Sequence, residues 1–122
     1  HLIRARESAE IINENVSCEI EIIEGLKERD YGILTGLTKT EAAQNHPKVV
    51  EAHKDPMNTD PEGESFIDFN DRVVKAFEEI RKQKFYAIAI IAHGGSLKRI
   101  LNYLEEPIPD SIGDGGVVEV DV

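Results

Sequence analysis

An apolar run that ends in a histidine and two glycines is the feature that most constrains this chain. Residues 85–92, "FYAIAIIA", are apolar throughout, which is typical of a strand that is covered on both faces. His93, Gly94 and Gly95 follow directly, and residues 96–105 then show the apolar spacing of a helix. This order predicts a layered α/β fold, in which ligands bind beyond the carboxyl ends of the strands.

The turn after this strand has two interpretations. It is either a tight turn with an incidental histidine or a phosphate site. In the second case the glycines let the backbone approach a ligand, and the N–H groups at the start of the following helix favour an anion. The spacing differs from the G-x-x-x-x-G-K-[ST] pattern of a Walker loop. The pattern alone favours neither interpretation over the other.

The other elements are predicted from periodicity and capping patterns, with Thr38–Glu41 and Ser65–Asp68 as capping boxes. Helices are expected at 4–15, from 38 until Pro47 ends the helix, and at 65–83. Further strands are expected at 18–23 and 117–122, and loops at 24–37 and 54–63. Without repeats or a second apolar core pattern, residues 1–122 are predicted to form a single domain.

Charge and cysteine content narrow the partners and the compartment. The net charge of −10 argues against nucleic-acid binding through a basic face, but it leaves room for a small anionic ligand. Cys18 is the single cysteine, so no intrachain disulfide can form and a cytoplasmic location is expected. No apolar run is long enough to cross a membrane. The chain begins at His1 within a helical pattern, so we expect it to be a fragment.

Four segments that follow one another in the sequence favour the phosphate site over the tight turn with an incidental histidine. They are "LIRARESAEI" (2–11), "LKERDYGILTGLTKTE" (26–41), "PEGESFIDFNDRV" (61–73) and "AHGGSLKRILNYL" (92–104). In this order and spacing the chain resembles the histidine phosphatase superfamily, which contains cofactor-dependent phosphoglycerate mutases and phosphatases. The resemblance implies a three-layer α/β/α phosphoglycerate mutase-like fold, of which residues 1–122 would be the C-terminal part. It also implies phosphoryl transfer through a phosphohistidine.

The resemblance assigns catalytic and phosphate-binding roles to particular residues. Glu28 matches the acid that protonates the leaving oxygen and later activates water, and His93 matches the second histidine that contacts the phosphoryl group. Arg4 matches an arginine that holds phosphate oxygens, and Gly94 gives the backbone room beside them. Without the resemblance, a solvated arginine and a surface carboxylate would be the better interpretations of Arg4 and Glu28.

Other residues have supporting roles by the same comparison. Tyr31 and Lys39 match positions that touch the rest of the substrate. Arg29 lies between motif residues and is expected to support the pocket. Arg72 is expected to be structural and to pair with carboxylates. No metal and no other cofactor is expected, because arginine and histidine supply the positive charge.

The family's nucleophile is missing from these residues. It is the histidine of an R-H-G motif on the first strand, and no R-H-G occurs here. His1, His46 and His53 lack that context, and the spacing of the last two does not fit a zinc site. A central strand that should pair beside residues 86–92 is missing with the motif. We therefore expect that the 122 residues alone are inactive and fold poorly.

The sequence favours a phosphatase over a mutase. Residues 42–60 are short and contain no Arg-Arg pair, and His93 is followed by Gly-Gly rather than the Gly-Asn usual in mutases. We expect hydrolysis of small phosphate monoesters. A phosphoglycerate mutase and a non-catalytic module that binds a phosphorylated ligand remain as alternatives. The sequence leaves the substrate open, and it does not distinguish a monomer from a homodimer.

Overall fold

The computed structural model describes residues 3–109, 113 and 115–122. The chain divides into two compact units. The first contains Glu28 and the residues before it, together with the residues from Val73 onward, and the second is Arg29–Arg72. The expectation of a single domain over 1–122 stays a prediction.

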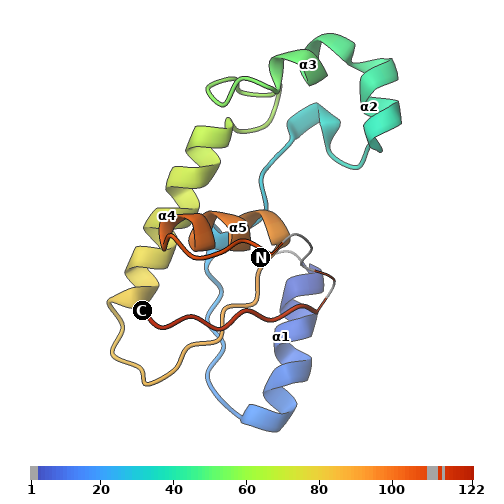
Figure 1. Ribbon diagram of the computed structural model, residues 1–122. Coiled ribbons are helices and arrows are strands. Elements are labelled where there is room, and N and C mark those ends of the chain that lie inside the picture. The colour runs from blue at the N-terminus through green and yellow to red at the C-terminus, as the bar shows by residue number, and fades with distance from the viewer. Residues whose placement is uncertain (1–2, 110–112, 114) are drawn as a thin grey trace. The chain divides into compact units, whose positions relative to one another are not determined.

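The first unit is built around the apolar faces of its helices. It contains α1 (Ile3–Val16), the later part of α4 (Phe66–Arg81) and α5 (Gly94–Tyr103), which Figure 1 shows in blue, yellow and orange. A short 3₁₀ helix, η1 (Glu24–Leu26), lies between α1 and the second unit in the sequence. The apolar side chains that are buried here come from all of these segments except α1: Leu26, Val73, Phe77, Ile80, Ile100 and Leu101.

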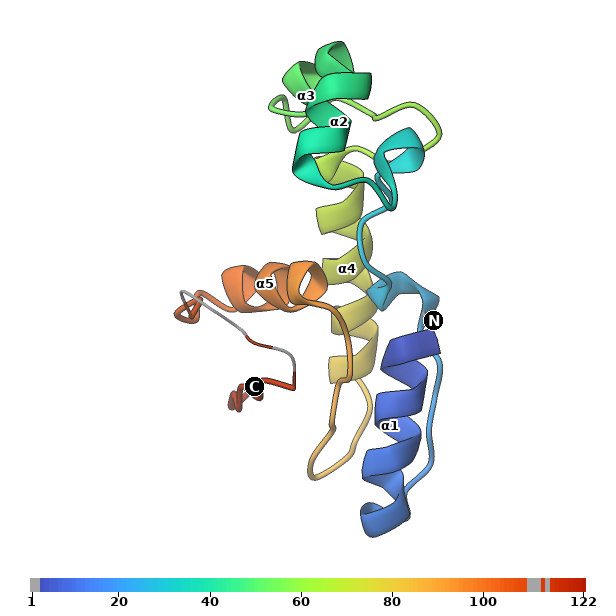
Figure 2. The ribbon, with the colours of Figure 1, turned by 90° about the vertical axis from the view of Figure 1, so that its right-hand side faces the viewer.

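The second unit begins with a short 3₁₀ helix, η2 (Gly32–Leu34), and continues with α2 (Lys39–Asn45), α3 (Pro47–Ala52) and the first residues of α4. Helices α2 and α3 pack against each other, as Figure 2 shows. The predicted capping box of α2 is confirmed: the Glu41 amide donates to Thr38 Oγ1 at 3.2 Å, and the Thr38 amide donates to Glu41 Oε2 at 2.8 Å. Pro47 follows the end of α2 as predicted, but it also opens α3, a position where its missing N–H costs nothing.

The longer helices were predictable from their periodicity. The helix expected at 4–15 is α1, and the helix expected at 65–83 is α4. Ser65 caps α4 as predicted, since its Oγ accepts from the Asp68 amide at 3.0 Å and donates to the Asp68 carboxylate at 2.6 Å. The helix expected at 96–105 is α5, but it starts two residues earlier. The two glycines assigned to a turn therefore form the first residues of this helix.

The three predicted strands are not present in the part of the chain that the structure describes. Residues 18–23, 86–92 and 117–122 run without helix and without a strand ladder, and the pairing described is an isolated antiparallel bridge between Thr59 and Ser65. A strand requires a neighbour that pairs with its N–H and C=O groups. An apolar pattern predicts where a strand can form, but it does not provide that neighbour.

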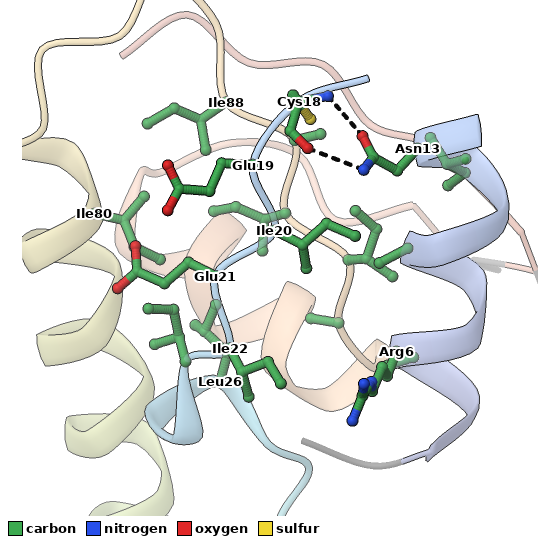
Figure 3. Close-up of a pocket in the computed structure, with 18 of the residues that line it drawn as sticks. Arg6, Asn13, Cys18, Glu19, Ile20, Glu21, Ile22, Leu26, Ile80 and Ile88 are labelled. Carbon is green, nitrogen blue, oxygen red and sulfur yellow. Dashed lines mark hydrogen bonds between the residues drawn. The ribbon is translucent and has the colours of Figure 1, made fainter. Parts of the chain in front are cut away.

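Two of these segments and α1 surround a cavity of about 380 Å³. Residues 18–23 return along α1 in both Figure 1 and Figure 2, and residues 87–92 line the cavity as well. Figure 3 shows Ile20, Ile22 and Ile88 around it. The segment 18–23 is tied to α1 by Asn13, whose side chain accepts from the Cys18 amide at 2.8 Å and donates to the Cys18 carbonyl at 2.9 Å.

Among the described residues, no helix is both long and apolar enough to span a membrane.

Candidate active site

His93 stands at the junction between the segment 86–92 and α5. Its backbone is extended, with φ −108° and ψ 161°, and its carbonyl accepts the first helical hydrogen bond from the Leu97 amide at 2.9 Å. The residue is therefore the N-cap of α5, although the segment before it is not a strand as the sequence predicted. Its side chain makes no capping hydrogen bond to the first turn of the helix.

Glu28 meets the same helix end. Its Oε2 accepts a hydrogen bond from the Gly95 amide at 3.0 Å, so a carboxylate lies at the positive end of the α5 dipole. The contact depends on the absence of a side chain at Gly95, because a Cβ there would lie 2.0 Å from Glu28 Oε1. A Cβ at Gly94 would meet nothing within 4 Å. The role expected of Gly94, room for the backbone beside a phosphate, stays a prediction.

Arg4 completes this charged group. Partial burial lowers the pKa of His93 from its ordinary value of 6.5, and the positive charge of Arg4 lowers it further, while the Glu28 carboxylate acts in the opposite direction. The neutral imidazole is therefore favoured. Arg4, Glu28 and His93 all belong to the first unit, and the charges of Arg4 and Glu28 both act on His93.

Ser96 holds this arrangement in place, although the sequence did not single it out. Its side chain is fully buried, and its hydroxyl donates to the carbonyls of Leu26 and Lys27 at 2.9 and 3.1 Å. The first turn of α5 is thereby tied to the residues that directly precede Glu28. The signal in the sequence was a serine among otherwise apolar core positions of a helix, which requires a hydrogen-bond partner when it is buried.

In the second unit, the loops at residues 29–32 and 61–65 lie against each other. Arg29 donates to the Glu64 carbonyl at 3.1 and 3.2 Å, and the Asp30 amide donates to the Glu64 carboxylate at 3.0 Å. A Cβ at Gly32, whose φ is +53°, would lie 1.9 Å from the Pro61 carbonyl oxygen. Glycine is therefore required there both by its backbone conformation and by the backbone that packs on it.

The structure also places the supporting residues. Arg72 forms an ion pair with Glu64, so the prediction that it pairs with a carboxylate is confirmed. Tyr31 and Lys39, the two predicted substrate contacts, belong to the second unit, and Lys39 is the exposed first residue of α2. Over the described residues, no group of three or more His, Cys, Asp or Glu side chains is arranged to hold a metal ion.

Comparison of the sequence with known proteins places the chain in a family. Residues 1–114 match the sequence profile of the histidine phosphatase superfamily (branch 1). The chain is 36% identical over 105 residues to a metal-independent phosphoserine phosphatase of Arabidopsis thaliana, a match that covers 81% of this chain and 44% of that protein.

Two further relatives carry different names. The chain is 30% identical over 118 residues to a 2,3-bisphosphoglycerate-dependent phosphoglycerate mutase of Cytophaga hutchinsonii, a match that covers 91% of this chain and 55% of that protein. It is 27% identical over 110 residues to the uncharacterised phosphatase PhoE of Bacillus subtilis, with 89% and 52% covered. The chain spans about half the length of these curated relatives.

Proposed function

Because this chain belongs to branch 1 of the histidine phosphatase superfamily, we propose that the whole protein hydrolyses small phosphate monoesters through a phosphohistidine. The observation that carries the proposal is the carboxylate of Glu28 on the Gly95 amide, at the helix end that His93 caps. This puts a group that can exchange a proton beside a histidine and an arginine that suit phosphate oxygens. Such a set matches the needs of phosphoryl transfer, which depends on positioning and charge.

The reaction we propose has two steps. A histidine outside these 122 residues attacks phosphorus in line, so that a P–N bond forms while the P–O bond to the alcohol breaks. Glu28 gives its proton to the departing oxygen. Water then attacks the phosphohistidine, Glu28 takes a proton from that water, and the P–N bond breaks to release phosphate. Arg4 and His93 stabilise the charge on the phosphoryl oxygens in both steps.

The proposed fold of the whole protein is the three-layer α/β/α arrangement. In it the segments 18–23 and 86–92 become strands of a sheet, and the strand that carries the nucleophile lies beside 86–92. The apolar side chains that line the cavity along these segments support this placement. The carboxyl end of such a strand would meet the same edge as His93, where the charged residues gather.

A phosphatase is the first choice among related activities, and a mutase is the second. The Gly94-Gly95 pair after His93 and the absence of an Arg-Arg pair in residues 42–60 support hydrolysis. Lys39, the E-R-D-Y-G match and the relatives named as phosphoglycerate mutases support the alternative. A third candidate, a module that binds a phosphorylated ligand without turnover, is motivated by the missing R-H-G motif. As partner we propose a small phosphorylated metabolite, and as compartment the cytoplasm.

The first test replaces the proposed acid. In the full-length gene product, Glu28→Gln keeps an acceptor for the Gly95 amide but cannot exchange a proton, so we expect hydrolysis of p-nitrophenyl phosphate to slow by about 10²- to 10⁴-fold. Glu79→Gln is the matched control, because Glu79 is an exposed carboxylate of α4 that pairs with Lys82 just after the helix. A near-normal rate in Glu28→Gln contradicts the assignment. Absence of turnover in the unmodified protein, with phosphate esters still bound, favours the binding module.

A further inference from the structure

A second group of charged residues lies in the unit Arg29–Arg72, apart from the residues given catalytic roles. Asp60 is fully buried, and its Oδ2 lies 2.7 Å from His53 Nδ1 and 3.5 Å from Arg29 Nη2. Asp60 Oδ1 accepts from the Asn58 side chain at 3.4 Å. Arg29 is also buried, with 7% of its surface exposed. A buried carboxylate of this kind is stable only when it is paired and hydrogen-bonded.

The geometry fixes the protonation state of His53. An ionised carboxylate only accepts hydrogen bonds, so Nδ1 of His53 must carry the hydrogen that faces Asp60. On the other side of the ring, Nε2 lies 3.3 Å from Arg29 Nη1. A guanidinium only donates, so Nε2 must offer a lone pair. The arrangement is satisfied by one state alone, the neutral ring with its hydrogen on Nδ1.

Tyr31 packs on both members of this contact. Its ring centroid lies 5.5 Å from that of His53, with the two planes inclined by 37°, and Arg29 Cζ lies 5.3 Å from the Tyr31 ring. Tyr31 is 39% exposed, so one part of its ring packs on the cluster and the rest faces solvent. Any movement of the Arg29 guanidinium or of the His53 imidazole therefore changes the packing contacts that hold the Tyr31 ring.

We propose that His53 and Asp60 are positioning residues that hold Arg29 under Tyr31, and that protonation of His53 releases this hold. The inference rests on the proposed function and on the expectation, from the family resemblance, that Tyr31 touches the substrate. A second proton on His53 turns Nε2 into a donor that faces the Arg29 donor, so the contact is lost and two cations adjoin.

The groups that face His53 come from three segments of the same unit. Asp60 and Arg29 contact its two ring nitrogens, and Tyr31 packs on its ring. Near His53 in the sequence, Glu51 and Lys54 are exposed and pair with each other at 2.6 Å. Among these groups Asp60 is the acidic contact of the ring and Arg29 the basic one.

The test uses the full-length protein and two histidine variants. In His53→Gln the side chain cannot donate to Asp60 and accept from Arg29 at the same two positions as the imidazole nitrogens. It also carries no group that can be protonated. His46→Gln is the control, because His46 lies in the same unit between α2 and α3. With p-nitrophenyl phosphate we expect KM of the unmodified protein and of His46→Gln to rise on acidification. In His53→Gln we expect KM to be raised by about 2- to 10-fold at neutral pH, the size of one net hydrogen bond, with a weaker dependence on pH and little change in kcat.

A measurement that does not depend on turnover tests the role of His53 separately from the proposed phosphatase activity. Nitrogen-15 NMR of the imidazoles should show His53 with its hydrogen on Nδ1 at neutral pH, and the Tyr31 ring signals should shift as His53 titrates. A hydrogen on Nε2, a charged ring at neutral pH, or Tyr31 signals that ignore the titration would overturn the proposal. If the NMR results hold while no phosphate ester is turned over, the proposed function fails and the positioning cluster stands.

Discussion

Gly95 lies where any side chain would meet the Glu28 carboxylate. The atoms that a Cβ would contact belong to the far end of a flexible side chain, so the clash can be relieved by moving the carboxylate rather than the backbone. An alanine inside α5 is also the better helix former, by up to about 1 kcal/mol. A side chain at this residue is therefore expected to keep or raise the stability of the fold, and at the same time to displace the proposed acid.

We expect Gly95→Ala to leave the free energy of unfolding of the full-length protein unchanged or raised. Its kcat should fall by about 10²-fold, the usual effect of a misplacement near 1 Å. Gly94→Ala is the matched comparison, since its Cβ enters open space and does not touch Glu28. Urea unfolding and steady-state kinetics check both variants. A Gly95→Ala enzyme that is destabilised but fully active would show that the Glu28 contact supports the fold and not the reaction.

At the scale of elements, the sequence predicted those features that depend on residues within one helical turn. Capping residues such as Thr38 and Ser65 act within one turn, and so the starts of α2 and α4 could be placed from the sequence. The extended segment 86–92 was recognised as apolar, but pairing depends on a partner elsewhere. The roles of Gly95 and Ser96 depend on Glu28 and Leu26, about 70 residues away in the chain, and no periodicity encodes such contacts.

Ser96 offers a test of how α5 is joined to the segment before Glu28. In Ser96→Ala, two carbonyl oxygens lose the hydroxyl that they share in the core, so we expect the free energy of unfolding to fall by about 1–3 kcal/mol. Ser8→Ala is the control, because Ser8 is exposed and donates to the Arg4 carbonyl within α1. Chemical denaturation of the full-length protein measures both. An equal, small effect for the two variants would mean that the Ser96 contacts contribute nothing beyond those of a surface serine.

At the scale of the whole molecule, the absence of a sheet from the described part of the chain follows from backbone pairing. The segments 18–23 and 86–92 carry apolar side chains along a cavity but form no ladder within the described part of the chain. Helices satisfy their own backbone groups, whereas extended segments need neighbours. This difference explains why the helical elements persist in these residues while the α/β layering predicted from the sequence does not.

Hydrogen exchange can test whether these segments become strands in the full-length gene product. We expect the amides of 86–92 to be protected there by several orders of magnitude, because core strands open only with global unfolding. In the isolated 122-residue chain the same amides should exchange rapidly. The amides of α4 serve as an internal reference, since their hydrogen bonds lie within one helix and are made in either form. Rapid exchange at 86–92 in the full-length protein, with α4 protected, would contradict the three-layer fold and the proposed position of the nucleophile beside His93.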